Sequence, residues 1–262
     1  MRRYIRIYWQ MMKMSFATLL AYRSNLINNT LSSLAWAALT FVSIYLITSK
    51  SPNVYGWTRE QLILLTAVYS LMIGAFHALF TGNFEELATR ISYGQLDGLL
   101  VKPIDVQFSA TCGKIRYTPF VRIIAAAVVI GLILQEMNVV VTMPMFILFL
   151  LFTIAGLMIL YSLWLITSTL LIWNPRLTNL IDVLFSVSSM ARYPGEMYSH
   201  VHITVYALVF PLTFVSVVPV KALTGMVSGS DIGWLMGLAI GLFMVSRLFW
   251  MRALRSYASS SG

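Results

Sequence analysis

The sequence predicts an all-α integral membrane protein with about six membrane-spanning helices. Of its 262 residues, 59% are hydrophobic and only 10% are charged, and the mean hydropathy is +0.80. A soluble domain is about half apolar and one quarter charged, so a soluble protein of this length would have too few charges to cover its surface. The apolar residues also gather in long runs. We therefore expect a single transmembrane domain over residues 1–262.

Five apolar runs are clear candidates for membrane spans, because a hydrocarbon core of about 30 Å needs ~20 helical residues. The runs cover residues 29–48, 62–80, 120–134, 143–173 and 234–251. The first run follows an amphipathic stretch and not a short charged region, so we expect it to be retained and not cleaved as a signal.

Lysine and arginine predict the orientation, because they collect in the cytoplasmic loops of membrane proteins. With the N-terminus inside, all but four of the 18 basic residues lie on the cytoplasmic side. The four on the external side are Lys50, Arg59, Arg192 and Lys221. We therefore expect both termini in the cytoplasm. The same asymmetry accounts for the net charge of +9, so the charge does not indicate nucleic acid.

The apolar region 180–223 is interrupted by three prolines, Pro194, Pro211 and Pro219. One crossing is required between residues 175 and 231 to keep Arg176 and the C-terminus on the same side. We place this crossing at 178–190 and interpret 193–227 as an external, proline-broken, re-entrant helical hairpin, packed against the bundle as non-helical backbone in a membrane requires. The alternative puts the crossing at 201–218 and lays 178–190 along the inner surface.

Residues 2–20 predict an amphipathic helix at the membrane interface. Arg2, Arg6 and Lys13 gather on one side of a helical wheel, and a basic face opposite an apolar one lies in the headgroup plane. The apolar side holds Ile5, Tyr8, Met12, Phe16 and Leu19.

The loop after the second span predicts a short helix beginning at Asn83. Asn83 is placed as its N-cap, with Glu85 and Glu86 in the first turn. Four of the nine acidic residues lie in this loop: Glu85, Glu86, Asp97 and Asp105. A helix with mixed charge and one apolar face suits docking to a soluble partner. A solvated connector fits the same composition, and the residues alone leave both interpretations open.

The sequence shows no motif typical of an enzyme active site. The sole Gly-Lys pair, Gly113-Lys114, has Phe108 where the first glycine of a phosphate-binding loop would stand. We therefore expect no nucleotide hydrolysis by this chain and no cofactor bound to it. The three histidines, His77, His200 and His202, are too scattered for a metal motif, and the single Cys112 allows no disulfide within the chain.

Ionisable residues inside spans are functional candidates by default, and His77, Arg122 and Asp182 are the ones expected there. Arg122 lies two residues inside its span, so we expect its side chain to snorkel to the inner headgroups. An ion-coupled carrier usually needs carboxylates near the midplane, which argues against that class. Candidates to line a path for an amphiphilic substrate are Trp36, Tyr69, Met158 and Tyr161, although such residues more often pack or anchor at interfaces.

The segment from Gly94 to Pro103, read as Gly-Gln-Leu-Asp-Gly-Leu-Leu-Val-Lys-Pro, resembles the G-x-L-D-x-L-L-x-K-P signature of ABC type-2 permeases, in their branch of small six-span subunits. Weaker similarities follow in the same order as in that family. They are Tyr22-Arg23-Ser24-Asn25, Gly56-Trp57-Thr58, Tyr193-Pro194 and the stretch 210–214. The resemblance covers essentially the whole chain.

This resemblance implies a role for each segment. Residues 2–20 would be the connecting helix and 83–101 the coupling helix, which sits in a groove of a separate ATP-binding subunit. The contacts at that joint would be Glu85, Glu86, Arg90 and Asp97. Two ATPase subunits would carry ATP and Mg²⁺, and a second permease chain, identical or a sibling, would enclose the path.

The resemblance further implies an exporter in the bacterial inner membrane, surrounded by lipids and without a nucleic-acid partner. Members of the family export lipids, drugs, antibiotics or glycans, and the signature does not identify which. Two other functions stay open on the residues alone. One is a membrane scaffold or assembly factor without transport, and the other is an ion-coupled carrier.

Overall fold

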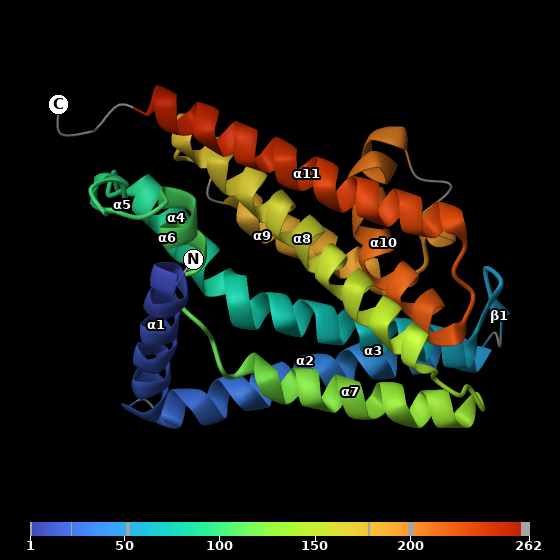
Figure 1. Cartoon of the computed structure of the whole chain (residues 1–262). Coiled ribbons are helices and arrows are strands. Elements are labelled where there is room, and N and C mark those ends of the chain that lie inside the picture. Colours follow the sequence, from blue (N-terminus) through green and yellow to red (C-terminus); the bar gives the residue numbers. More distant parts are fainter. Residues whose placement is uncertain (1, 22, 51–52, 178, 199–201, 258–262) are drawn as a thin grey trace.

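A computed structural model describes residues 2–21, 23–50, 53–177, 179–198 and 202–257 (Figure 1). The helices, in chain order, are α1 (Arg2–Ala21), α2 (Arg23–Lys50), α3 (Arg59–Phe76), η1 (His77–Thr81), α4 (Gly82–Ser92), α5 (Asp97–Leu100), α6 (Val106–Thr111), α7 (Pro119–Glu136), α8 (Met143–Trp173), α9 (Asn179–Ser188), η2 (Ser189–Arg192), η3 (Gly195–Tyr198), α10 (Ile203–Thr224) and α11 (Gly229–Ser256). The sequence-named residues Tyr22, Thr178 and His200 lie outside the described residues.

The predominantly helical class is confirmed, with one small addition. Between α2 and α3 the chain forms a short antiparallel hairpin of β1 (Asn53–Val54) and β2 (Trp57–Thr58). Gly56 has a φ of +85°, which this tight turn needs and which an L side chain rarely adopts. Thr58 then caps α3 through a capping box with Gln61, so the hairpin leads directly into the helix.

Five helical stretches in the described part of the chain are long and apolar enough to cross a membrane. They are Ile27–Ser49, Arg59–Ser92, Pro119–Glu136, Met143–Trp173 and Gly229–Ser256. Each contains the whole of one of the five predicted spans. In Figure 1 they run side by side, with the β-hairpin at one end of the bundle and α4, α5 and α6 at the other. We call the latter the α4 end.

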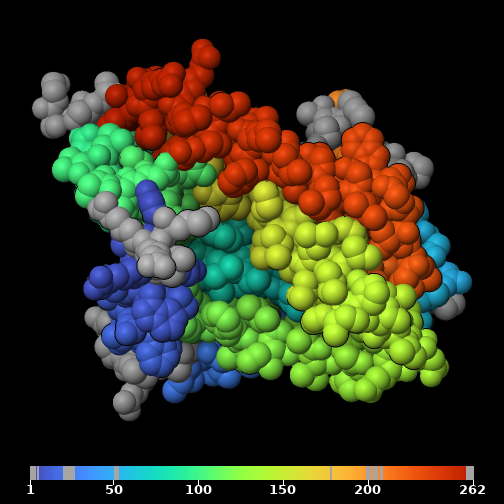
Figure 2. All heavy atoms as spheres, viewed as in Figure 1, coloured from blue at the N-terminus to red at the C-terminus, as the bar shows by residue number. Residues whose placement is uncertain are grey.

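Helix α3 lies at the centre of the bundle. It packs against α2, α7, α8 and α10, and the space-filling view in Figure 2 shows little of it because the other helices cover it. In its most apolar stretch 72% of the residues are buried, against 17% for α2 and for α11. The outer faces of α2 and α11 are therefore apolar and uncovered, as expected for surfaces that meet lipid or another membrane chain.

The prediction that prolines break the region after α8 is wrong for α10. Pro211 and Pro219 both lie inside this continuous helix of 22 residues. Pro219 cannot donate a hydrogen bond to the Val215 carbonyl, and α8 closes over that site because it carries Gly156 there. A Cβ on Gly156 would lie 3.1 Å from the Val215 oxygen. Close packing by a neighbouring helix is how membrane helices tolerate proline.

Two helices of unequal length occupy the region where one further crossing was predicted. Helix α9, 10 residues long, corresponds to the predicted crossing at 178–190, and η2 extends it by 4 residues. Helix α10 corresponds to the alternative crossing at 201–218 and forms most of the expected hairpin at 193–227. The six-span count, the re-entrant hairpin and the interfacial position of α1 stay predictions.

Candidate functional site

The second predicted span and the loop helix after it form one continuous helix. Helix α3 passes through the π-helical turn η1 directly into α4, so the predicted helix start at Asn83 is wrong. Two carbonyls of the π-helical turn have specific partners. The Ala78 oxygen accepts from the Arg116 backbone N–H at 2.9 Å, and the Leu79 oxygen accepts from Asn83 Nδ2 at 3.0 Å. These two hydrogen bonds do not belong to the helix's own backbone hydrogen-bond pattern, and they stabilise the π-helical turn. Such turns are frequent at functional sites.

Asn83 clamps the segment after α6 onto α4. Its Nδ2 also donates to the Lys114 carbonyl at 2.9 Å, and its Oδ1 accepts from the Lys114 backbone N–H at 2.8 Å. The side chain is buried, with 3% of the residue exposed. A buried amide that satisfies both groups of one peptide fixes the position of that peptide, because losing the side chain would leave both groups unpaired.

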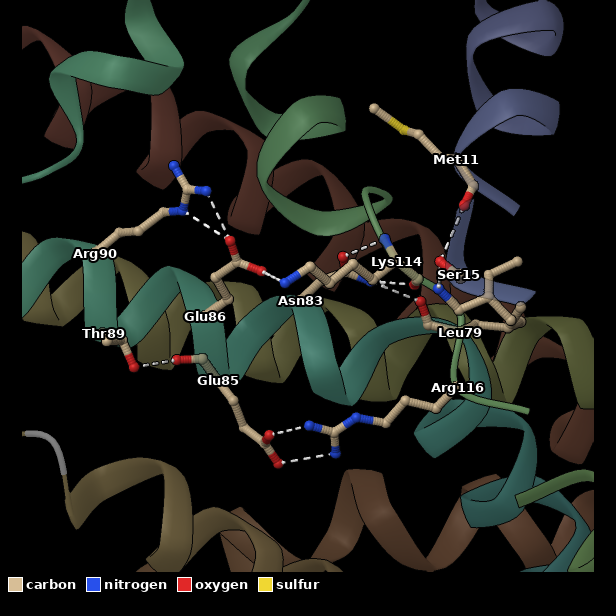
Figure 3. A network of polar contacts seen from close by, with 11 residues as sticks. Met11, Ser15, Leu79, Asn83, Glu85, Glu86, Thr89, Arg90, Lys114 and Arg116 are labelled. Atoms are coloured by element: carbon tan, nitrogen blue, oxygen red, sulfur yellow. Dashed lines mark hydrogen bonds and ion pairs between the residues drawn. The ribbon is translucent and has the colours of Figure 1, made fainter. Parts of the chain in front are cut away.

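Three of the four predicted coupling residues lie together on α4, each paired within the chain (Figure 3). Glu86 binds Arg90 at 2.7 Å and Lys114 Nζ at 2.5 Å. Glu85 binds Arg116 on another side of the helix. All of these side chains keep 30–61% of their surface exposed, so the ion pairs contribute little stability and the charges stay accessible to a partner.

The fourth residue, Asp97, belongs to a different helix. The predicted single helix over 83–101 is two helices, because Gly94 ends α4 with a φ of +66° and the Gln95 N–H bonds back to the Arg90 carbonyl at 2.7 Å. Asp97 then begins α5 beside Tyr257, which directly follows α11. Burial and the neighbouring Asp97 carboxylate both raise the pKa of the Tyr257 hydroxyl.

An apolar tip was missed by the sequence analysis. Tyr93 lies in the turn between α4 and α5, Leu100 is the last residue of α5 and Val101 follows it, and they are 73%, 39% and 84% exposed. We call these three residues the tip. The leucines and valine before Lys102 could be seen in the sequence, but which of them face outward depends on the turn at Gly94. Exposed apolar residues grouped at one end of a molecule indicate a binding surface.

A polar network connects α6 to the long helices α8 and α11. Asp105 caps α6 by accepting from the Phe108 N–H, and Arg247 of α11 donates to Asp105 at 2.7 Å and to Gln107 Oε1 at 2.6 Å. Gln107 Nε2 donates to the Tyr161 hydroxyl of α8 at 2.8 Å. Partial burial opposes ionisation of Asp105, but the bonds from Arg247 and the helix amides outweigh it and lower the pKa of that carboxyl.

Helix α1 docks on the same segment, 105–117, from another side. The Tyr117 hydroxyl donates to the Met12 carbonyl at 3.0 Å, and the Ile115 N–H donates to Ser15 Oγ at 3.3 Å. Nearer the start of α1, the ring of Tyr4 meets Phe108 edge to face with centroids 5.1 Å apart. The segment therefore joins α1, α4 and α11 at the α4 end.

The four predicted path residues are not brought together. Trp36 is 68% exposed on α2, Tyr69 is buried in α3, and Met158 is half-buried in α8. Tyr161 is buried in the polar network, where it also contacts the rings of Phe80 and Phe84. In the part of the chain that the structure describes, no hydrogen bond or ring contact joins any two of these four residues. Nor do the described residues contain a group of three or more side chains placed to hold a metal.

Comparison with known proteins identifies the family. A sequence model described as ABC-2 family transporter protein matches residues 34–261. The match begins inside α2 and runs through every later element, so it covers the bundle, the tip and the polar network. Searches of curated proteins and of solved structures found no match. The chain belongs to the ABC-2 transporter family and is a membrane-spanning transport protein.

Proposed function

We propose that the chain is the permease subunit of an ATP-binding cassette exporter. With a second permease chain it forms the path for a hydrophobic or amphiphilic substrate, and two separate ATPase subunits bind ATP and Mg²⁺ and drive it. The family match over 34–261 is the observation that carries this proposal. The α4 end then faces the cytoplasm, as the charge distribution predicts.

The α4 end has the construction that coupling to an ATPase needs. Helix α4 continues α3 without a break, and α3 is the most buried of the candidate spans, so a force on α4 acts directly on the centre of the bundle. The clamp at Asn83 and the network at Asp105 add connections from the same end to α11 and α8. A packed core transmits such a displacement because it is close-packed and stiff.

The tip is the proposed anchor in the ATPase groove. Tyr93, Leu100 and Val101 offer exposed apolar area around α5, and the charges of Glu85 and Arg90 lie on the preceding helix, α4. An apolar centre with a charged rim is the usual composition of a protein interface. In this arrangement the tip supplies most of the affinity, and Glu85, Glu86, Arg90 and Asp97 set the orientation.

The test is a matched pair of valine substitutions. Val101→Asp places a charge in the tip, whereas Val140→Asp places the same charge on the turn between α7 and α8, where Val140 is 81% exposed and Val101 is 84% exposed. We expect Val101→Asp to weaken co-purification with the cognate ATPase by about tenfold or more, as loss of an interface anchor does. Val140→Asp should leave co-purification unchanged, and equal behaviour of the two variants would refute the anchor.

Reconstitution with the ATPase separates the remaining functions. A permease predicts substrate-dependent stimulation of ATP hydrolysis, lost in Val101→Asp and weakened by charge reversal at Asp97. A scaffold predicts no stimulation by any substrate. A carrier predicts transport that follows an ion gradient and continues without ATP.

A further inference from the structure

A small pocket lies at the α4 end, between α4, α5 and α6. Its cavity volume is about 130 Å³, and Met11 of α1 forms part of its wall. Pockets for drug-sized molecules measure about 300–1,000 Å³, so this one has room for a single small group and not for a nucleotide or a whole lipid. We call it the α4–α6 pocket.

The lining of the α4–α6 pocket is positively charged. One carboxylate, Glu86, lines it together with three cations, so two positive charges are in excess. The cations are Arg90, Lys102 and Lys114. Glu86 binds Arg90 at 2.7 Å and Lys114 Nζ at 2.5 Å. Figure 3 shows Glu86 and Arg90 on the side of α4 that faces Lys114, with Glu85 on another side.

Lys102 is the cation of this lining that has no carboxylate partner. No ion pair among the described residues includes it. It is exposed, and it directly follows Val101 of the tip. An ammonium group carries three donors and no acceptor, so an unpaired lysine at the pocket is available to an anion.

Ser109 gives an independent indication of a ligand. It lines the pocket from α6, and only 7% of the residue is exposed. Its hydroxyl has no hydrogen-bond partner among the described residues. A buried polar atom of this kind in a native structure points to a water molecule or an ion that completes its hydrogen bonds. Asn83 also lines the pocket, but its amide is bonded to the Lys114 backbone, so it fixes the wall in place.

We propose that the α4–α6 pocket binds a phosphate group, held by Lys102, Arg90 and the hydroxyl of Ser109. A phosphate monoester carries a charge of about −1.5 to −2 at pH 7, which matches the two excess positive charges of the lining better than the single charge of a carboxylate does. Two sources can supply the group. One is soluble phosphate, and the other is the phosphomonoester headgroup of a membrane lipid, since α1 is predicted to lie in the headgroup plane and forms part of the wall.

The bound phosphate joins α4, α6 and the tip. Arg90 belongs to α4 and Ser109 to α6, whereas Lys102 continues the chain directly from Val101. Hydrogen bonds between ionised groups are about twice as strong as neutral ones, so occupancy orders the backbone that carries the tip. The binding is a property of this chain and does not depend on the ATPase.

Isothermal titration calorimetry of the full-length chain in dodecyl maltoside, at constant ionic strength, tests the binding. The first probes are inorganic phosphate and acetate. We expect phosphate to bind at least about tenfold more tightly, as one additional charge-assisted hydrogen bond provides. Equal affinities would overturn the proposal, because the pocket would then suit a carboxylate, such as an acidic side chain of a partner. Absence of saturable phosphate binding would overturn it for the soluble source.

Two lipid probes distinguish the sources. They are dioctanoyl phosphatidic acid, which carries a phosphomonoester, and dioctanoyl phosphatidylcholine, which does not. Competition between phosphatidic acid and inorganic phosphate would support the site with the membrane as a source. Binding of phosphate with no preference for phosphatidic acid over phosphatidylcholine would support the soluble source. Binding of neither phosphate nor phosphatidic acid would overturn the site altogether.

Two lysine variants locate the binding. Lys102→Gln should weaken phosphate binding by about tenfold, because one charge-assisted hydrogen bond is lost. The matched control is Lys13→Gln, which removes another exposed lysine, one that lies over the Trp9 ring of α1 and does not line the pocket. Lys102 is exposed, so its variant should fold as the wild type does. Equal phosphate affinity of Lys102→Gln and the wild type would overturn the proposal.

Hydrogen exchange tests the effect on the tip. Saturating phosphate should slow the exchange of the backbone amides of residues 99–102 in the wild type and leave it unchanged in Lys102→Gln. Unchanged exchange in the wild type, or equal slowing in the two proteins, would overturn the ordering of the tip by the bound phosphate.

Discussion

Replacing Asn83 by leucine should release the segment that follows α6 while the rest of the bundle stays folded. The substitution keeps the branched shape of a buried side chain but removes its hydrogen bonds to the backbone N–H and carbonyl of Lys114 and to the Leu79 carbonyl. The two groups of Lys114 are then left without their partner. The chain offers a natural probe for this change, because its single cysteine, Cys112, lies two residues before Lys114.

The expected magnitude follows from the lost bonds. Leaving a buried donor or acceptor unsatisfied costs ~1–3 kcal/mol. The two Lys114 groups are part-buried, so we take about 1.5 kcal/mol for each, and together they lower the free energy of opening the segment by about 3 kcal/mol. Each 1.4 kcal/mol is a tenfold change in an equilibrium constant, which gives about a hundredfold increase in the open population. Cys112 is half-buried, and burial raises the pKa of its thiol, so the wild-type thiol reacts slowly.

The assay is the rate of modification of Cys112 by a maleimide under native conditions, which tracks the open population when opening and closing are fast. Thr89→Ala is the matched control, since Thr89 is an exposed residue of α4 whose hydroxyl donates to the Glu85 carbonyl of the same helix. Cys112→Ser gives the background. A rate for Asn83→Leu within about twofold of the wild type, in folded protein, would refute the clamp.

Three further substitutions test other contacts. Gly156→Ala should lower the thermal midpoint by overpacking worth ~1–3 kcal/mol, because the new Cβ would lie 3.1 Å from the Val215 backbone oxygen, which cannot move aside as a flexible side chain does. Gly131→Ala, with open space around it, should leave the midpoint unchanged. Tyr161→Phe should cost about 1–2 kcal/mol in thermal unfolding, because it removes a buried, doubly hydrogen-bonded hydroxyl. The pKa of Asp105 is lowered in the folded protein, so its bond to Arg247 contributes stability above about pH 4 that is lost as the pH falls further. The midpoint difference between wild type and Asp105→Asn should therefore shrink from pH 5 to pH 3, and a difference as large at pH 3 as at pH 5 would contradict this.

The spans could be predicted because every helix that crosses a lipid bilayer must be about 20 residues long and predominantly apolar. The run 143–173 coincides with α8 at both ends, and the run 120–134 falls one residue inside the start of α7 and two inside its end. Neither result needs any knowledge of neighbours, since length and hydropathy alone select these segments. The region between α8 and α11 has no such uniform signal, because its helices are short or contain proline.

The candidate site could be predicted only in part, because its residues are fixed by contacts distant in sequence. Asn83 is a residue type that often caps helices. It has a different role here only because the backbone of Lys114, 31 residues later in the sequence, lies against its side chain. Pro219 is a residue type that usually ends a helix. Helix α10 continues through it only because α8 approaches closely at Gly156. Local propensity is overruled in both places by packing that the sequence does not display.

The π-helical turn η1 sets the angular phase between α3 and α4. An α-helix turns by about 100° per residue, and a π-helical turn holds about one residue more than an α-helical one. The side chains of α4 therefore point more than a quarter-turn away from where an unbroken α-helix would direct them. Removing one residue between 77 and 81 would turn this stretch into an ordinary α-helix and leave Asn83 facing Lys114, whereas straightening the turn with every residue kept would rotate Asn83 away. Two sequences with equal composition could thus differ in whether the end of the bundle engages its neighbours at all.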